Sequence, residues 1–365
     1  MMHMAFFGSS LLSSYWNGAA TYYRGILKAM ADRGWRITFY EPDAFGRQQH
    51  RDIDPPDWCE VIVFEATAEA ARKMLARAAE ADVVIKASGV GVLDDEILTG
   101  TVALGGLGRV ALFWDVDAPA TLAEISQDPQ HILRKSVPRL AGVLTYGGGE
   151  PVVRAYMQVG AKICVPIYNA LDPTTHHPVA PQERFRADIA FLGNRLPDRE
   201  ARVETFFFEA ARLLPERTFL LAGSGWEPDA LPANVRLIGH LPTADHNAFN
   251  CSARAVINIS RSSMAATGHS PATRVFEAAG AGACLISDRW AGIEQFLAPG
   301  EEILVADDAR EIAFLLETLS AERAGEIGGN ARQRVLSDHT YDQRAKTLDM
   351  FLGTLLSHNR VSAIA

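Results

Sequence analysis

Short runs of apolar residues, many of them β-branched or aromatic, alternate along the chain with longer segments in which apolar residues recur every three or four positions. The short runs have the length of buried strands, and the longer segments have the period of helices with one apolar face. Strands that alternate with helices in this way are typical of βαβ units, which build parallel sheets. The pattern therefore predicts an α/β fold.

The first half of the chain reads as one Rossmann-like domain, residues 1–168. Its strands are expected at Met4–Phe7, Arg36–Tyr40, Val61–Phe64, Val83–Ala87, Val110–Trp114, Val143–Tyr146 and Ile163–Pro166. Helices are expected to start near Asn17, Thr67 and Pro151, with others near Pro119 and Pro129. Asn17 has the side chain of an N-cap, and apolar residues follow it at helical spacing. The loop before it contains no G-x-G-x-x-G, which argues against a dinucleotide cofactor.

The alternating pattern breaks at residues 169–187, which are rich in proline and lack periodicity, so this segment is expected to be a linker. A second doubly wound domain is expected at residues 188–340. Its strands are expected at Ile189–Leu192, Thr218–Ala222, Val235–Ile238, Ala255–Ile259, Ala283–Ser287 and Ile303–Val305. Helices are expected at Pro197–Leu214, at Asp245–Cys251 and from about Asp308. The last helix, within residues 341–365, could pack back onto the first domain.

Two adjacent histidines, His176 and His177, stand in the expected linker. Histidines are common metal ligands, but a site needs at least three ligands and no third one is nearby in the sequence. We therefore expect both to be solvated linker residues.

Composition narrows the class of protein. The chain has 365 residues, of which 48% are hydrophobic, enough for two packed domains. It has 35 basic and 44 acidic residues, a formal net charge of −9, and no run rich in Lys and Arg. Nucleic acid and anionic membranes are therefore not expected partners, and an anionic ligand would have to be bound by a local cluster of charge.

The cysteines and the N-terminus indicate a cytoplasmic protein. Cys59, Cys164, Cys251 and Cys284 lie far apart and form no CxxC pair, so they read as reduced core thiols. The N-terminus has no basic region and only a short apolar run, so neither a signal peptide nor an integral membrane segment is expected.

The stretch Ser260–Asp288 combines a strand exit, a loop, a helix and the next strand. Ser270 is a good N-cap and Pro271 suits the first helical position, so the helix is expected to begin there. The loop before it, residues 262–269, is small and polar. Backbone amides and the positive end of the helix could therefore face an anion such as a phosphate.

This helix has two chemically different faces. Val275, Ala278 and Ala279 form an apolar stripe, whereas Arg274 and Glu277 fall on the opposite side. The polar side could bind a ligand. Alternatively, Arg274 and Glu277, three residues apart, could be only a surface ion pair.

In the first domain, Asp115 and Asp117 follow directly after an expected strand. Residues past the carboxyl end of a parallel strand face the ligand crevice of such sheets, so both are candidates for acid–base chemistry. Asp117 could instead cap the turn that follows. Asp43, His50 and Asp52, in the polar loop between residues 41 and 56, are weaker candidates on the same side of the sheet.

The second half resembles the C-terminal domain of GT-B glycosyltransferases of the glycosyl transferases group 1 family, and most closely the group that includes the spore-maturation protein CgeB. The residues that carry this resemblance are Ser270–Ala278, Gly282–Asp288, Gly292, Glu294, Pro299–Glu302, His339–Tyr341 and Arg344. The first half matches only in architecture, as is usual for the acceptor-side domain of this fold.

The resemblance implies that the second domain holds a nucleotide-diphosphate-sugar donor. Glu277 stands where the family places the carboxylate that receives the donor ribose, and a carboxylate can accept from both hydroxyls of a vicinal diol. The other residues assigned to donor binding are Asn17, Gly18, Asn194, Arg195, Gly223, Gly225, Trp226, Gly268, Ser270 and Arg274. Of these, Arg195 and Arg274 would neutralise the diphosphate, and Trp226 could stack on the base or merely cover a strand end.

One position departs from the family pattern. Many retaining GT-B enzymes carry a Glu eight residues before the Glu277 position, and here His269 occupies it. The family's sugar-contacting carboxylate is therefore not carried over. His269 joins Asp115 and Asp117 as a catalytic candidate.

We therefore expect a metal-independent GT-B glycosyltransferase that uses no cofactor, because the nucleotide sugar is a substrate. The acceptor, whether a protein, a saccharide or a small molecule, is open. Asp115-Val116-Asp117 also matches the Asp-x-Asp metal motif of the other major glycosyltransferase fold, but two doubly wound domains outweigh a three-residue motif. The alternatives are a non-catalytic two-domain protein that binds sugars or nucleotide sugars, and a nucleotide-sugar epimerase on the same fold.

Overall fold

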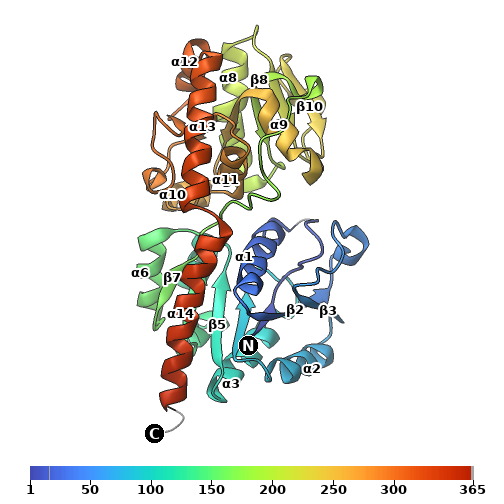
Figure 1. The fold of residues 1–365 in the computed structure, drawn as a ribbon, viewed down its shortest axis with the longest axis vertical. Coiled ribbons are helices and arrows are strands. Elements are labelled where there is room, and N and C mark those ends of the chain that lie inside the picture. Colours follow the sequence, from blue (N-terminus) through green and yellow to red (C-terminus); the bar gives the residue numbers. More distant parts are fainter. Residues whose placement is uncertain (16, 363–365) are drawn as a thin grey trace. The chain divides into compact units, whose positions relative to one another are not determined.

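The computed structural model describes residues 1–15 and 17–362, which form two compact units. One unit consists of Met1–Tyr168 together with the chain from Tyr341 onward, and the other of Asn169–Thr340. Each unit contains one parallel sheet with helices packed on both of its faces (Figure 1). Residues 169–187, expected to be a linker, belong to the second unit. Residues 363–365 of the expected last helix lie outside the described residues.

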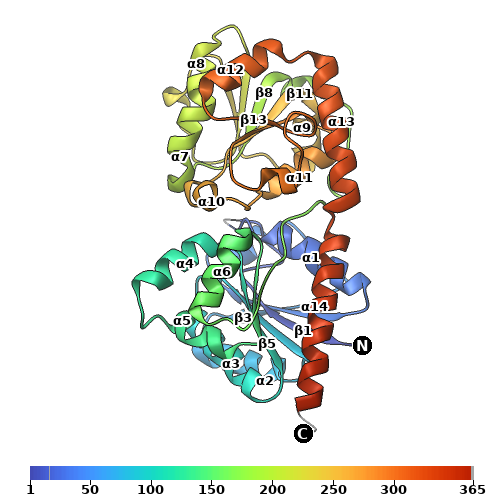
Figure 2. The same ribbon diagram turned by 90° about the vertical axis from the view of Figure 1, so that its left-hand side faces the viewer.

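The first unit has a seven-stranded parallel sheet in the order β3-β2-β1-β4-β5-β6-β7. Figure 2 shows this sheet turned from the view of Figure 1. Its strands are β1 (His3–Phe7), β2 (Arg36–Asp43), β3 (Glu60–Glu65), β4 (Val83–Ala87), β5 (Val110–Asp115), β6 (Gly142–Thr145) and β7 (Cys164–Pro166). Its helices are α1 (Ala20–Asp32), α2 (Ala68–Ala78), α3 (Asp94–Gly106), α4 (Ala118–Gln127), α5 (Ile132–Ser136), α6 (Gly149–Val159) and α14 (Tyr341–Ser362). The central strands β1, β4 and β5 are buried along their whole length, which explains their continuous apolar sequences.

The second unit has a six-stranded parallel sheet in the order β10-β9-β8-β11-β12-β13. Its strands are β8 (Ala187–Leu192), β9 (Phe219–Ala222), β10 (Val235–Gly239), β11 (Ala253–Asn258), β12 (Leu285–Asp288) and β13 (Leu304–Ala306). Its helices are α7 (Pro197–Val203), α8 (Glu209–Leu213), α9 (His246–Ser252), α10 (Ser262–Thr267), α11 (Thr273–Gly280), α12 (Ala309–Thr318) and α13 (Ala321–Asp338). A π-helical turn, Glu204–Phe208, joins α7 to α8 and places three phenylalanines in the core.

Several helices begin where the sequence supplies a capping side chain. The Thr67 side chain accepts from the backbone N–H of Ala70 at the start of α2. Asp308 accepts from two backbone N–H groups at the start of α12, and Ser320 from one at the start of α13. Each such cap stabilises its helix by about 1 kcal/mol. The local sequence therefore fixes these helix starts.

The last helix, α14, packs against α1 within the first unit (Figure 1). A Cβ added at Gly25 of α1 would lie 2.3 Å from the Tyr341 ring, so a glycine permits this close approach. At the far end of α1, Asp349 accepts from the indole N–H of Trp35 at 2.8 Å and pairs with Arg33. These contacts attach the end of the chain to its beginning.

The structure corrects four local expectations. Helix α3 was not expected at all. Residues 262–267 form the helix α10 rather than a loop. Helix α11 begins at Thr273, not at Ser270, whose hydroxyl donates to the Gly268 carbonyl oxygen instead of capping. Helix α1 begins at Ala20, and Asn17 is not its N-cap.

Candidate functional site

The middle of the second sheet is a topological switch point. The strands β8 and β11 are neighbours there, and the strand order runs outward from them in opposite directions. In open α/β sheets, ligands bind outside the carboxyl ends of the strands at such a point. Here these ends are Leu192, followed by Gly193, and Asn258.

Two arginines from different helices meet at this point. Arg199 comes from α7 and Arg274 from α11, and both guanidinium groups lie over the ring of Phe191, at 5.5 and 5.2 Å from its centroid. A Cβ added at Gly193 would lie 2.9 Å from Arg199 Nη2 and 3.1 Å from Arg274 Nη2. The absence of a side chain at Gly193 therefore leaves room for both cations beside the backbone.

The hydrogen-bond partners of the two cations carry no negative charge. Arg199 donates to the Asn194 carbonyl oxygen and Arg274 to Asn258 Oδ1 at 3.2 Å, and both acceptors are neutral. Among the described residues, no carboxylate forms an ion pair with either arginine. Burial and the nearby positive charge of Arg274 both lower the pKa of Arg199, to about 9. Burial also lowers the pKa of Arg274, to about 10, although the negative charge of Glu277 acts in the opposite direction. Arginine nevertheless keeps its proton in proteins, so a bound anion would relieve this repulsion.

Arg195, expected to neutralise the diphosphate, has its charge already matched. Its guanidinium pairs with Glu200 at 2.7 Å and with Glu227 at 3.0 Å. Arg199, four residues further along, is the residue directed to the switch point. Arg199 is buried on the same side of this helical segment as Val203 and Phe206, whereas Arg195 lies before the helix.

The loops after β8 and β9 pack closely against each other. A Cβ added at Gly223 would lie 2.2 Å from the Gly193 carbonyl oxygen, and Gly223 has a φ of +133°. The Asn194 side chain accepts from the Ser224 backbone N–H at 2.9 Å, and Gly225 has a φ of +87° beside the Cβ of Arg195. These residues shape the backbone of the site.

Trp226 is buried and holds this arrangement in place. Its indole N–H donates to the Gly193 carbonyl oxygen at 2.8 Å, and its ring packs edge-on against Phe208. The ring belongs to the core of the second unit. Of the two roles considered from the sequence, this position favours covering the strand end over stacking on a nucleobase.

The segment before α11 has an unusual backbone. Gly268 has a φ of +71°, and a Cβ there would lie 2.7 Å from backbone and side-chain atoms of Ala291. His269 has a φ of +49°, rare for a residue with a side chain. Its Nδ1 is buried without a hydrogen-bond partner, and its ring lies against the Cα of Gly292. Backbone strain of this kind is concentrated at ligand-binding sites, which keeps His269 a candidate.

Glu277 lies one turn beyond Arg274 on α11, with 15% of its side chain exposed. It forms no ion pair with Arg274, so the surface-pair interpretation does not hold. Two histidines face it, His176 from the loop after β7 and His246 from the start of α9. The expectation that His176 is a solvated linker residue is wrong, because its side chain is 3% exposed.

In the first unit, Asp115 ends β5 and is fully buried. It accepts hydrogen bonds from the hydroxyls of Ser88, Thr121 and Tyr156 and from the backbone N–H of Asp117. Burial raises the pKa of Asp115 above its usual value, although these donors oppose the rise. These four contacts give Asp115 a structural role in the first unit, and its catalytic role stays a prediction.

Replacing Asp115 with Ala is expected to lower the free energy of unfolding by about 3 kcal/mol or more, because several buried donors lose their acceptor at once. Urea unfolding followed by circular dichroism measures the change. The exposed Asp54→Ala serves as the matched control and should stay within about 0.5 kcal/mol of the unmodified protein. A loss no larger than that of the control would show that Asp115 does not support the fold.

Asp117 occupies a different environment. It is half-buried at the N-cap position of α4, where its backbone carbonyl oxygen, not its side chain, accepts from Ala120 and Thr121. The expected capping by its side chain is therefore not observed. Asp117 remains the better catalytic candidate of the two aspartates.

Other candidate residues of the first unit lie in its loops, where most of their contacts are with neighbouring loop residues. The Asn17 side chain accepts from the Ser9 hydroxyl and donates to two backbone carbonyls, so it is already satisfied, whereas the neighbouring Gly18 is exposed. Asp52 forms a two-pronged pair with Arg24 at 2.7 and 3.0 Å. Neither Asn17 nor Asp52 is arranged as an open binding group.

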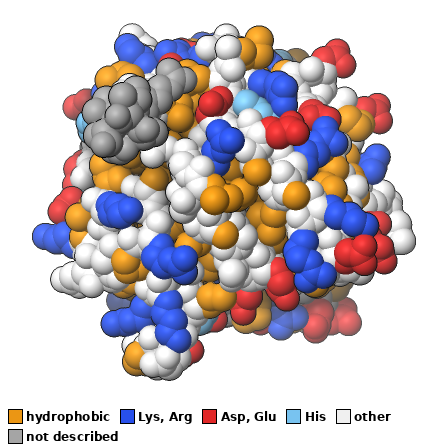
Figure 3. All heavy atoms as spheres, turned by 90° about the horizontal axis from the view of Figure 1, so that it is seen from below, with side chains coloured by type: hydrophobic (Ala, Val, Ile, Leu, Met, Phe, Trp, Pro, Cys, Tyr) orange, Lys and Arg blue, Asp and Glu red, His pale blue; other side chains and the backbone are white. Residues whose placement is uncertain are grey.

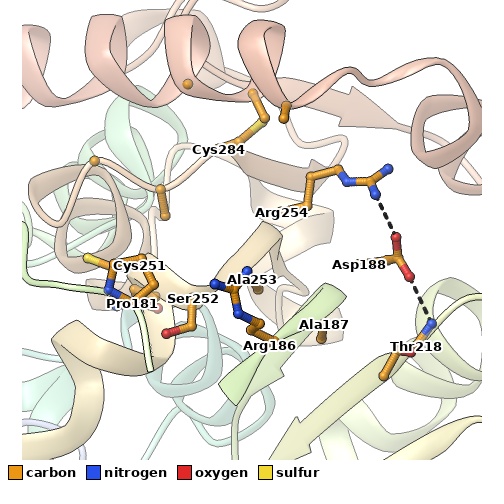
Figure 4. Close-up of a pocket in the computed structure, with 16 residues that line it drawn as sticks. Pro181, Arg186, Ala187, Asp188, Thr218, Cys251, Ser252, Ala253, Arg254 and Cys284 are labelled. Carbon is orange, nitrogen blue, oxygen red and sulfur yellow. Dashed lines mark hydrogen bonds and ion pairs between the residues drawn. The ribbon is translucent and has the colours of Figure 1, made fainter. Parts of the chain in front are cut away.

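A hollow of about 570 Å³ in the second unit lies at the opposite edge of the sheet (Figure 4). It is lined by residues at the amino ends of the strands, among them Asp188, Thr218, Arg254 and Cys284. Asp188 accepts from the Thr218 N–H and pairs with Arg254 at 3.0 Å and with Arg217 at 3.2 Å. Asp188 is thus already engaged by two arginines, and the switch-point rule places ligands at the other edge.

The surface shows no concentration of one charge on the face drawn in Figure 3, where basic and acidic side chains are interspersed. In its described part, this face therefore has no basic patch of the kind that binds nucleic acid or anionic membranes. Among the described residues, no helix has the length and apolar character needed to cross a membrane.

Comparisons with known proteins support this description of the fold. Residues 199–349, which include most of the second unit, match the family model described as glycosyl transferase-like. A search of the curated proteins found no match. Among solved structures, the chain is similar to sucrose-phosphate synthase from Thermosynechococcus elongatus, with a TM-score of 0.73 and 14% identity, covering 98% of this chain and 100% of that one.

Two further solved structures have the same architecture. HepE from Anabaena, in complex with UDP and glucose, has a TM-score of 0.69 and 15% identity over 97% of this chain and 100% of that one. A glycosyltransferase from Rickettsia africae has a TM-score of 0.65 and 11% identity over 97% and 98%. The chain therefore has the GT-B fold, two Rossmann-like α/β units with parallel sheets of seven and six strands.

Proposed function

We propose that the protein is a glycosyltransferase that moves a sugar from a nucleotide-diphosphate-sugar donor bound by the second unit. One observation carries the proposal: the buried Arg199 and the half-buried Arg274, neither of them in an ion pair with a carboxylate, meet at the switch point of the sheet, and Glu277 follows on the same helix as Arg274. This arrangement suits a ligand with a diphosphate next to a ribose. The family match and the UDP complexes of HepE support the same class.

In this proposal the diphosphate replaces the missing negative charge between Arg199 and Arg274. Charge grows on the diphosphate oxygens as the bond to the anomeric carbon breaks. Fixed cations in a site with little water stabilise that charge without having to reorganise. Two guanidinium groups provide the neutralisation that a metal ion supplies in other transferases, so the transfer itself is proposed to need no metal. The order of motifs from Ser270 to Arg344 favours the CgeB-like group within this class.

The remaining chemical roles are assigned to two side chains. His269 would contact the sugar or its phosphate through its ring. Asp117, past the carboxyl end of β5 in the first unit, would orient or deprotonate the acceptor hydroxyl, since a half-buried carboxylate can accept that proton. The cytoplasm is the proposed compartment, because the four cysteines are free.

Calorimetric titration with UDP, GDP, dTDP and ADP and with their sugars tests the donor assignment directly. One of the nucleotides should bind with a single site, and its sugar conjugate should be consumed when an acceptor is supplied. The absence of binding to every member of the panel would refute the proposal. Tight binding of free sugar without any transfer would favour the non-catalytic alternative.

The contact between Gly292 and His269 gives a test of the histidine. A methyl group at Gly292 would lie 2.1 Å from His269 Nδ1, so the Gly292→Ala substitution must displace the ring. Gly300 is a matched control, because its φ of +82° is close to the +85° of Gly292 but no atom lies within 4 Å of its added Cβ. Both variants should lose about 1 kcal/mol of stability from the left-handed backbone.

Only Gly292→Ala is expected to weaken donor binding as well, by about fivefold, which corresponds to one lost hydrogen bond of about 1 kcal/mol. Calorimetry on both variants measures the difference. Equal donor affinities in Gly292→Ala and Gly300→Ala would remove His269 from the site.

A further inference from the structure

A compact group of metal-ligand side chains surrounds Glu277. The nearest ligand atoms of His176, His246 and Glu277 all lie within 4.8 Å of one another, and His176 Nε2 lies 3.8 Å from Glu277 Oε1. The three residues come from separate segments, the loop after β7 and the helices α9 and α11. Two imidazoles and one carboxylate are a ligand set that proteins use for zinc and for related divalent ions.

The two histidines are oriented as metal ligands usually are. His176 Nε2 and His246 Nδ1 are both buried without a hydrogen-bond partner. The other ring nitrogen of His176 contacts the Thr175 hydroxyl at 3.0 Å. In metal sites, a bond of this kind fixes the ring and leaves the opposite nitrogen for the ion. In His176 that opposite nitrogen, Nε2, is the one that lies 3.8 Å from the Glu277 carboxylate.

The chemistry of the group also favours a cation. A buried ring nitrogen without a partner costs free energy, and an ion would satisfy both nitrogens and the carboxylate together. A tetrahedral zinc ion holds its ligand atoms about 3.4 Å apart, so the group would contract by about 1 Å through rotation of the half-buried His246 and Glu277 side chains.

We propose that His176, His246 and Glu277 bind a divalent transition-metal ion of the zinc type, and that this ion competes with the nucleotide-sugar donor for Glu277. The second part rests on the proposed function, because it takes Glu277 to be the ribose-binding carboxylate. A carboxylate that coordinates an ion has an oxygen engaged and its charge partly neutralised, so it would accept less strongly from the two ribose hydroxyls. The site would therefore make donor binding sensitive to free zinc.

Metal binding is measured without any nucleotide. The full-length protein, stripped with EDTA and dialysed, is titrated with ZnCl₂ by calorimetry and with CoCl₂ by visible absorption, which reports coordination by histidine. One equivalent should bind, and His246→Ala and Glu277→Gln should each weaken binding at least tenfold. His177→Ala is the matched control. It removes the exposed neighbouring histidine and should leave the zinc affinity unchanged. Circular dichroism confirms that each variant is folded.

The results separate the metal site from the proposed function. Failure of the unmodified protein to bind one equivalent, or unchanged binding in folded His246→Ala, would overturn the site. For the competition, a saturating zinc concentration should weaken nucleoside diphosphate binding at least tenfold in the unmodified protein but not in His246→Ala, which also controls for zinc bound by the nucleotide itself. Equal effects in both proteins would overturn the competition. If the metal-free protein bound zinc, but bound no nucleotide when titrated in EDTA, the metal site would stand and the transferase proposal would be refuted.

Discussion

Replacing Arg274 with Met is expected to weaken binding of the nucleoside diphosphate about 100-fold without lowering the melting temperature of the free protein. A loss of this size corresponds to about 2.7 kcal/mol, within the range for hydrogen bonds to charged groups. Stability should be kept because the guanidinium is buried beside Arg199 without a carboxylate partner, so its removal relieves repulsion. Calorimetry gives the affinity and differential scanning fluorimetry gives the melting temperature.

Arg195→Met is the matched control for this substitution. Arg195 is close in sequence to the site, but its charge is matched by Glu200 and Glu227 at the surface. Its replacement should change donor affinity less than threefold, since exposed ion pairs contribute little. If Arg195→Met weakened binding as strongly as Arg274→Met, the diphosphate would lie nearer to Arg195, as the sequence alone suggested.

The strands were predictable because both sheets are parallel and covered on both faces. A strand in such a sheet is mostly apolar, so each one stands out as a short run between polar turns. Every expected strand overlaps an observed one. Helix α3 gave no such signal, because its sequence ends in glycines and its N-cap position is Leu93, in a left-handed conformation with a φ of 56°.

The start of α11 shows why local rules can fail. Ser270 and Pro271 satisfy the capping rules, yet contacts from distant residues decide the outcome. The side-chain amide of Asn169 donates to the Pro271 carbonyl oxygen, and the backbone N–H of His269 donates to the Ala291 carbonyl oxygen. These two contacts hold the segment in a non-helical conformation up to Ala272, and the helix starts only after it.

The candidate site was predictable in position but not in composition. Glu277 and Arg274 follow from the helix pattern and the resemblance, since both lie on one polar face. The choice of Arg199 over Arg195 depends on which side chain is buried, and that depends on how α7 packs. The histidines beside Glu277 come from segments far apart in the chain, so no sequence spacing could connect His176 with His246.

Glu277→Ala is expected to weaken binding of the nucleoside diphosphate about 30- to 100-fold, since each of two hydrogen bonds to a carboxylate contributes about 1–1.5 kcal/mol. All measurements are made in EDTA, so that no metal ion occupies the carboxylate. The exposed Glu294→Ala is the matched control and should bind like the unmodified protein.

Comparison with the 2′-deoxy nucleotide assigns the loss to the ribose. Removing the 2′-hydroxyl should weaken binding to the unmodified protein about tenfold, but it should have little effect on Glu277→Ala, because the acceptor of that hydroxyl is already gone. A coupling of this kind, measured over the four combinations of protein and ligand, isolates the interaction between the two groups. If the deoxy nucleotide lost the same affinity in both proteins, Glu277 would not contact the 2′-hydroxyl, and the effect of the Ala substitution would come from the electrostatic environment of Arg274 instead.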